Sequence, residues 1–197
     1  MSKTTLISLL SLVLAVSSGW VMAQPPPTMT QLQVFTPFTT SGLSIGLALT
    51  HRAKGSCFAT SAADPGRTDA WRCEAGNAVH DPCFVNLDQT RLACAENPFS
   101  ANAVMLTLTK DLPADTAGQE PNFKAAPWAL ELENGQTCTP LTGATAPIAG
   151  MRINYGCGDD AYVAGPGDRS RPLWRVFFQT PNRSLSLQQV AVTTAWY

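Results

Sequence analysis

A serine within a glycine-flanked pattern is the first residue of the chain with the chemistry of a nucleophile. Residues 42–46 read Gly-Leu-Ser-Ile-Gly and match G-x-S-x-G, the nucleophile elbow of many hydrolases. In that motif a sharp strand-to-helix turn exposes the serine hydroxyl, and a histidine far downstream acts as its base. Only His51 and His80 are available, both soon after Ser44, and no βαβ pattern surrounds the motif. A serine hydrolase that uses Ser44 with His51 or His80 is therefore the alternative interpretation and not the leading one.

A histidine next to a carboxylate is a second arrangement with acid–base chemistry. His80 directly precedes Asp81, and acid–base catalysis requires groups placed within hydrogen-bond reach of a substrate. Side chains of adjacent residues seldom face each other, however, and the dipeptide Asp81-Pro82 favours a turn. We therefore interpret this pair as part of the scaffold, and the leading interpretation contains no catalytic residue.

Residues that bind metals occur, but not in a recognisable binding pattern. His51 and His80 lack a third partner at a zinc-ligand spacing. Asp159, Asp160 and Asp168 supply oxygen atoms of the kind that calcium prefers, but their spacing differs from that of the EF-hand loop. Aspartate is also common in ordinary turns. We predict neither a metal site nor a cofactor.

Arginine and tryptophan are interleaved in one short segment towards the end of the sequence. Arg169, Arg171 and Arg175 surround Trp174, and both residue types are enriched where proteins bind partners. A guanidinium fork also matches carboxylates and phosphates. The alternative is that Trp174 faces the core while the arginines pair with the neighbouring aspartates. This segment, with Arg169, Arg171, Trp174 and Arg175, is the candidate binding site.

The first residues have the order of a secretory signal peptide. Lys3 lies in a short polar start, residues 6–16 are apolar apart from two serines, and small residues precede a cut after Ala23. The apolar run is shorter than the about 20 residues that a membrane-spanning helix needs. We therefore predict that residues 1–23 are a cleaved signal and that the product is secreted or periplasmic, without insertion into a membrane.

Six cysteines constrain the scaffold that must position the candidate residues. An even number in an exported chain indicates a disulfide framework, although many connectivities are possible. The sequence contains no C-x-x-C pair of the kind that would indicate a zinc site instead. Sequential pairing is favoured because it encloses only short loops, and it joins Cys57 to Cys73, Cys83 to Cys94, and Cys138 to Cys157.

Length and composition limit what the chain can be. Residues 24–31 contain three consecutive prolines and read as an extended linker, and residues 32–197 are long enough for a single domain with its own core. The formal net charge of −1 gives no electrostatic reason to expect nucleic acid or anionic lipid as a partner. With 15 prolines, 14 glycines and only 14% charged residues, the chain is typical of short elements joined by many turns.

Alternating and β-branched segments predict strands along the chain. Residues 55–100 hold four cysteines and two Asp-Pro dipeptides, so we expect an irregular segment there, pinned by disulfides. Asn134-Gly135 predicts a two-residue type I′ hairpin turn. The predicted fold is mainly β, a small antiparallel sandwich or barrel. The strand candidates are residues 33–36, 43–50 (for which a short helix stays open), 104–109, 128–132, 151–155, 173–179 and 185–197.

Motifs around the cysteines resemble those of a known family. They include Gly-Ser-Cys-Phe at 55–58, Asp-Ala-Trp-Arg-Cys at 69–73, Asp-Pro-Cys-Phe at 81–84, Thr-Cys-Thr at 137–139 and Asn-Tyr-Gly-Cys at 154–157. Over about residues 50–197 the chain is similar to an uncharacterised family of exported, cysteine-paired domains seen chiefly in actinobacteria. The resemblance implies export and paired cysteines, and it supplies no catalytic residue.

These observations favour an exported, non-catalytic binding module of the cell envelope or extracellular space. We expect it to recognise a protein or a glycan, as an inhibitor or immunity-type protein does. Rigid disulfide scaffolding and the arginine–tryptophan segment support this interpretation. The alternative is a secreted serine hydrolase based on Ser44.

Overall fold

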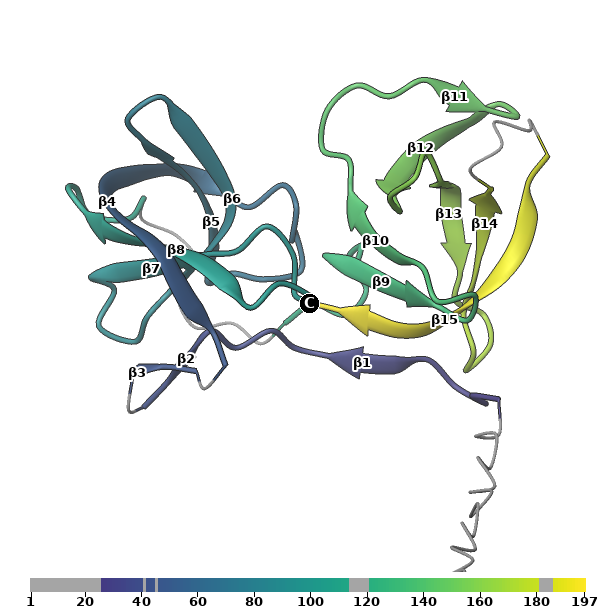
Figure 1. The fold of residues 1–197 in the computed structure, drawn as a ribbon, viewed down its shortest axis with the longest axis horizontal. Coiled ribbons are helices and arrows are strands. Elements are labelled where there is room, and N and C mark those ends of the chain that lie inside the picture. Colours follow the sequence, from purple (N-terminus) through teal and green to yellow (C-terminus); the bar gives the residue numbers. More distant parts are fainter. Residues whose placement is uncertain (1–25, 41, 45, 114–120, 181–185) are drawn as a thin grey trace, which may run out of the picture.

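The computed structural model describes residues 26–40, 42–44, 46–113, 121–180 and 186–197. The predicted signal peptide, residues 1–23, and the start of the linker lie outside the described residues. The described residues contain fifteen strands and no helix, so none of them forms a helix that would cross a bilayer. Two small β-barrels lie side by side, as Figure 1 shows.

The first barrel closes through one parallel and four antiparallel pairings. Its strands are β4 (Ala48–Thr60), β5 (Ala70–Ala75), β6 (Ala78–Val85), β7 (Arg91–Cys94) and β8 (Asn102–Leu108). Successive strands are antiparallel, and β8 closes the barrel by pairing with β4 in parallel. Alternate side chains point inwards, so Trp71, Leu92 and Leu106 fill the interior together with four cysteines.

The second barrel contains the strands from the later part of the sequence. They are β9 (Ala129–Leu132), β10 (Thr137–Pro140), β12 (Met151–Gly156), β13 (Tyr162–Asp168), β14 (Arg175–Gln179) and β15 (Gln188–Trp196). The order β15-β14-β13-β12-β10-β9 closes where β15 pairs with β9. The short strand β11 (Pro147–Ile148) pairs with β12 outside this ring. Leu130, Val163, Phe178 and Val192 are among the buried residues of its core.

The N-terminal part of the described chain contacts both barrels. The strand β1 (Gln31–Gln33) pairs in parallel with the end of β15, and the chain then continues to the two short strands β2 (Phe38–Thr39) and β3 (Gly42–Leu43) beside the first barrel (Figure 1). Phe35 lies in the segment between β1 and β2. Its ring lies 5.2 Å from the Phe84 ring of the first barrel and 5.1 Å from the Trp128 ring beside the second. This aromatic cluster joins the two barrels.

The structure confirms the mainly β fold, in two barrels where the sequence suggested one sandwich or barrel. Strands cover most of the predicted segments, but residues 34–36 form none, and the helix considered for residues 43–50 is wrong, because β4 begins at Ala48. The treatment of residues 32–197 as one domain stays a prediction. The aromatic cluster shared by the two barrels favours it.

The segment from residue 55 to residue 100 is more regular than predicted. Disulfides pin it as expected, but the end of β4 and all of β5, β6 and β7 run through it, with irregular backbone confined to the loops between them. The turn expected at Asp81-Pro82 is wrong, because both residues lie within β6. They face the single residue Arg72 of β5, since Trp71 pairs with Cys83 and the next pair skips one position. Such a bulge accommodates a proline that cannot donate to the ladder.

The Asn-Gly hairpin exists, but its turn differs from the predicted type. The amide of Gly135 donates to the carbonyl of Leu132, and the amide of Leu132 donates to the carbonyl of Gln136, which makes a three-residue loop. Gly135 has a φ of 81°, while Asn134 is not among the described residues with positive φ. The loop is therefore a type I turn followed by a left-handed glycine, and the type I′ assignment is wrong.

The disulfides follow the predicted sequential pairing. They join Cys57 to Cys73, Cys83 to Cys94, and Cys138 to Cys157. The first two bridges connect residues that face each other across β4–β5 and β6–β7. The third bridge belongs to the second barrel and lies beside the pairing of β10 with β12. Three disulfides indicate an oxidising compartment outside the cytoplasm.

Candidate functional site

A cleft of about 540 Å³ opens between the two barrels. This volume falls within the range of small-ligand pockets. Its walls are mostly proline, alanine and glycine, contributed by both barrels and by the segment between them. The lining residues are Ala62, Ala63, Pro65, Lys124, Ala126, Pro127, Pro140, Leu141, Thr142, Arg152, Asn154, Tyr155, Gly165, Pro166, Gly167 and Arg169.

The charged residues of the cleft all carry the same sign. Lys124, Arg152 and Arg169 line it, and no aspartate or glutamate does. Within the described part of the chain, none of the three cations forms a salt bridge. In a chain with a net charge of −1, this is a local concentration of uncompensated positive charge. A cleft with low-dielectric walls focuses the field of such charges and attracts anions.

Arg152 is held in place by neutral acceptors. It lies on β12, and its Nη2 donates to the carbonyls of Leu141 (3.0 Å) and Gly143 (2.7 Å). Its Nη1 donates to Oδ1 of Asn154 at 2.7 Å, and the amide of Asn154 in turn donates to the carbonyl of Gly165. The guanidinium group is therefore held in a fixed orientation while its positive charge is not neutralised, because none of its partners is anionic.

Arg169 is positioned in a similar way, by carbonyl groups and an aromatic ring. Its Nη1 donates to the carbonyls of Phe123 (3.2 Å) and Ala125 (2.9 Å), and the guanidinium carbon lies 4.5 Å from the centroid of the Trp174 ring. A cation over an indole face is attracted by the ring quadrupole. Among the described residues, Nε and Nη2 of Arg169 have no acceptor, so they remain available for a ligand.

Tyr155 closes the floor of the cleft. Its side chain is buried, and its hydroxyl donates to the carbonyl of Pro127 at 2.9 Å. Burial raises the pKa of the Tyr155 hydroxyl, and Arg169 opposes this shift. The hydroxyl is therefore neutral at ordinary pH and serves to hold the segment around Pro127 against the second barrel.

The structure separates the members of the predicted arginine–tryptophan site. Arg169 lines the cleft, while Trp174 is half-buried, packs against the second core and has Arg169 over its ring. Arg171 is exposed outside the cleft lining, and Arg175 lies on β14 opposite Asp168. Binding by the four residues as one site stays a prediction, and the cleft contains only one of them.

Sequence reasoning missed Lys124 and Arg152 as site residues. Lys124 comes from the segment between the barrels, and Arg152 lies on a predicted strand, so nothing in the local pattern connects them to Arg169. One usable signal was present. Arg152 and Asn154 alternate with Ile153 and Tyr155, which places the two polar side chains on the same outer face of that strand.

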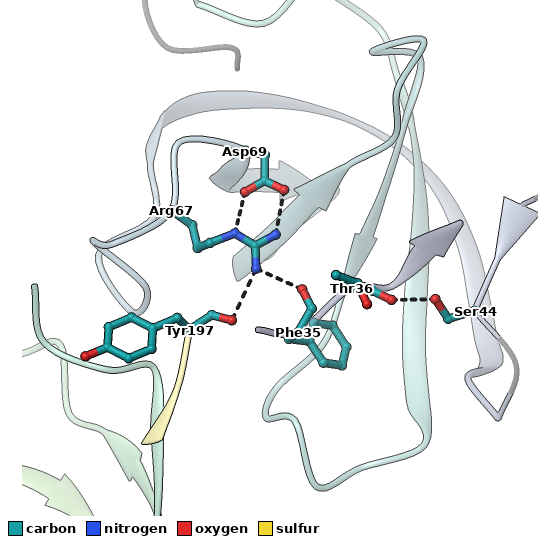
Figure 2. Close-up of polar contacts among 6 residues, drawn as sticks. All are labelled: Phe35, Thr36, Ser44, Arg67, Asp69 and Tyr197. Carbon is teal, nitrogen blue, oxygen red and sulfur yellow. Dashed lines mark hydrogen bonds and ion pairs between the residues drawn. The ribbon is translucent and has the colours of Figure 1, made fainter. Parts of the chain in front are cut away.

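The residues of the alternative hydrolase site lie on three different elements. Ser44 follows β3 in a loop, and its hydroxyl donates to the carbonyl of Thr36, as Figure 2 shows. His51 lies on β4 and His80 on β6. Among the described residues no hydrogen bond joins Ser44 to either histidine, and no helix follows the serine. In a nucleophile elbow the serine lies between a strand and a helix, and its hydroxyl faces a histidine. Here Ser44 lies in a loop, and its hydroxyl faces a backbone carbonyl.

Asp81 is occupied by partners other than its histidine neighbour. Its Oδ1 accepts a hydrogen bond from the hydroxyl of Ser61 at 2.5 Å, and its Oδ2 accepts from the amide of Ala62 at 3.2 Å. Nε of Arg72 lies 3.8 Å from the same carboxylate. These contacts match the interpretation of the His80–Asp81 pair as scaffold.

The aspartates considered as calcium ligands lie at the end of β13 and in the turn that precedes this strand. Asp168 accepts hydrogen bonds from the amide and the hydroxyl of Ser170, which lower the pKa of its carboxyl. Asp159 and Asp160 both have positive φ and lie in the turn between β12 and β13. Within the described ranges, no group of three or more histidine, cysteine, aspartate or glutamate side chains is arranged to hold a metal ion.

One buried carboxylate escaped the sequence analysis entirely. Asp64 is fully buried beside the cleft, between the lining residues Ala63 and Pro65, and neither of its carboxylate oxygens has a hydrogen-bond partner in the described structure. Burial raises the pKa of Asp64 to about 7, with Arg67 opposing the shift and Asp69 adding to it. The group is therefore protonated in mildly acidic conditions.

Comparison with protein-family models, with curated proteins and with solved structures found no match to this chain. The resemblance to exported actinobacterial domains therefore stays an expectation that rests on the cysteine motifs alone.

Proposed function

We propose that this chain is an exported, non-catalytic binding module, secreted or periplasmic, which holds an anionic ligand in the cleft between its barrels. The observation that carries the proposal is the cleft lining, in which Lys124, Arg152 and Arg169 occur without any carboxylate. Uncompensated cations at the rim of an apolar cleft favour the binding of a charged partner and speed its encounter.

The rigidity of the surroundings supports binding rather than catalysis. Both arginines are held by backbone carbonyls before any ligand arrives, which reduces the ordering cost of association. The cleft lining contains no histidine, cysteine, serine or carboxylate, and the Tyr155 hydroxyl in it already donates to the carbonyl of Pro127.

The disulfide framework and the N-terminal sequence support the location. Structural disulfides persist in oxidising compartments, and residues 1–23 have the order of a secretory signal. The proposed setting is the cell envelope or the extracellular space, where the ligand is part of a protein or a glycan.

The test is a titration of the isotope-labelled mature chain with citrate, a compact polyanion, followed by NMR. We expect amide shifts around Gly165, Gly167 and Ala126, and we expect them to weaken in Arg152→Gln. The matched control is Arg171→Gln, which removes an exposed arginine outside the cleft. Equal responses from the two variants, or no response at the cleft, would contradict the proposed function. Hydrolysis of an ester, peptide or glycan that Ser44→Ala abolishes would support the hydrolase alternative instead.

A further inference from the structure

The polar groups of the cleft are few, and some already have partners. Asn154 accepts from Arg152 and donates to Gly165, and the Tyr155 hydroxyl donates to Pro127. Apart from these two side chains and the three cations, Thr142 is the only residue of this lining whose side chain carries a polar group. A ligand therefore meets strong donors at the cationic groups and few donors or acceptors elsewhere.

The remaining lining residues contribute no polar side chain. Pro65, Pro127, Pro140 and Pro166 have no backbone N–H, and their rings present only apolar atoms. Alanine, glycine and Leu141 add no polar side chain. A polar ligand group that is desolvated against such a wall without a partner costs free energy.

These walls discriminate between the two classes of anionic partner. A sugar chain carries hydroxyls around each ring, and most of them would lose water against proline and alanine without gaining a partner. A polypeptide segment has apolar side-chain stems and carries its charge at the tips of aspartate or glutamate. The flat face of Trp174, which a sugar would need for stacking, is covered by Arg169.

The arginine forks determine which part of a polypeptide binds. Arg152 and Arg169 are oriented by carbonyls and an amide. Among the described residues, Nε and Nη2 of Arg169 have no acceptor, so this fork can bind a planar carboxylate in a bidentate manner. Arg152 donates both Nη2 hydrogens to Leu141 and Gly143, and it keeps Nε and one Nη1 hydrogen for a ligand. Clusters of arginine recognise acidic motifs in several binding domains. We propose that the cleft binds an acidic segment of a partner protein, with aspartate or glutamate side chains held by Arg152 and Arg169. This inference rests on the proposed function and names the class of its ligand.

The experiment compares three probes on the mature chain by calorimetry and NMR. The first probe is a peptide of about six glutamates, capped at both ends so that its only charges are side-chain carboxylates. The second is the matched glutamine peptide, and the third is an oligogalacturonate with the same number of carboxylates. We expect binding of the glutamate peptide alone, with amide shifts at the cleft and weaker affinity as salt rises.

Variants decide whether the binding depends on the assigned residues. We expect Arg152→Gln to weaken binding of the glutamate peptide by about tenfold or more, as loss of a charged hydrogen bond predicts. Arg171→Gln, an exposed arginine outside the lining, should bind as the wild type does. An equal loss in both variants would overturn the inference, because general charge would then explain the binding.

The outcomes also separate this inference from the proposed function. If the oligogalacturonate binds at the cleft in an Arg152-dependent manner and the glutamate peptide does not, the ligand is an acidic glycan and only the inference fails. Binding of the glutamine peptide with the affinity of the glutamate peptide would also overturn it, since the carboxylates would then be irrelevant. If no anion, citrate included, shifts the amides of the cleft, the proposed function fails as well.

Discussion

Nη1 of Arg67 donates a hydrogen bond of 3.2 Å to the carbonyl oxygen of Tyr197, a residue 130 positions away in the sequence. The same nitrogen donates to the carbonyl of Phe35 at 2.8 Å, while Nε and Nη2 bind Asp69, each at 2.6 Å. Figure 2 shows one guanidinium group joining three separate segments. Since β15 belongs to the second barrel and Arg67 to a loop of the first, this group connects the two barrels.

Loss of the Arg67 side chain should destabilise the protein strongly. Arg67→Met leaves the carbonyl of Phe35 without its donor and takes one of two donors from the carbonyl of Tyr197, which keeps the amide of Phe35. It also removes the partner of Asp69 from a site where Arg67 is 7% exposed. We expect the free energy of unfolding to fall by about 2–4 kcal/mol. Chemical denaturation measures this, with Arg171→Met as the control that should change stability by less than about 0.5 kcal/mol. Similar effects of the two substitutions would show that Arg67 does not join the barrels.

Asp64 should make stability depend on pH. Its pKa is raised from 3.8 to about 7 by burial, so the folded state binds this proton more tightly than the unfolded state. The stabilisation is complete below about pH 4 and is lost as pH rises towards 7. Compared with Asp64→Asn, which does not titrate, the wild type should lose about 3 kcal/mol between pH 5 and pH 8.

Denaturation of both proteins at several pH values measures that difference. The groups that face Asp64 electrostatically are Arg67, Asp69 and Asp81, and all three are retained in the variant. A constant difference between the two proteins across this range would mean that Asp64 ionises as an ordinary exposed carboxyl.

Gly55 should tolerate no side chain. A Cβ at this position would lie 2.3 Å from the carbonyl oxygen of Glu74 on the neighbouring strand. Gly55→Ala therefore forces β4 and β5 apart, and we expect a loss of about 1–3 kcal/mol or more in thermal or chemical unfolding. Gly143→Ala is the matched control, since nothing lies within 4 Å of a Cβ there. A stable Gly55→Ala protein would indicate a different strand spacing.

The disulfides should be visible in the mass of the exported product. Reduction should add two hydrogens for each of the three bridges. Intact-mass spectrometry before and after reductant measures this, and peptide mapping should recover the sequential pairs. A chain made in the cytoplasm without residues 1–23 is the control, where reducing conditions should leave free thiols. Free thiols in the exported product would contradict the predicted location.

The strands that the sequence predicts best are those with local alternation. Residues 104–108 lie in β8, and residues 151–155 lie in β12. In β12 the buried Ile153 and Tyr155 alternate with more exposed neighbours, whereas in β8 the consecutive residues Met105 and Leu106 are both buried. Local patterns do not reveal which strands pair with each other to close a barrel. The pairing of β4 with β8 and that of β9 with β15 join segments far apart in the sequence, and both barrels depend on them.

The errors have identifiable physical causes. The Asp81-Pro82 dipeptide resembles a turn, but a bulge opposite Arg72 absorbs it within β6. In the candidate site, Arg169 was predictable from its arginine-rich neighbourhood, whereas Lys124 and Arg152 join it only because the two barrels and the segment between them meet. Asp64 is fully buried, although its Asp-Pro-Gly motif is typical of an exposed turn, so the local pattern did not predict this burial.

The position of β15 has a consequence for the order in which the protein is completed. This strand pairs with β14 along its first half, and with β9 and β1 along its second half. A ribosome makes it after all of them, so one edge of β14, one edge of β9 and the strand β1 lack this partner until β15 emerges. Unpaired edges readily accept strands from other chains. The interval before closure is therefore the period of greatest exposure to aggregation.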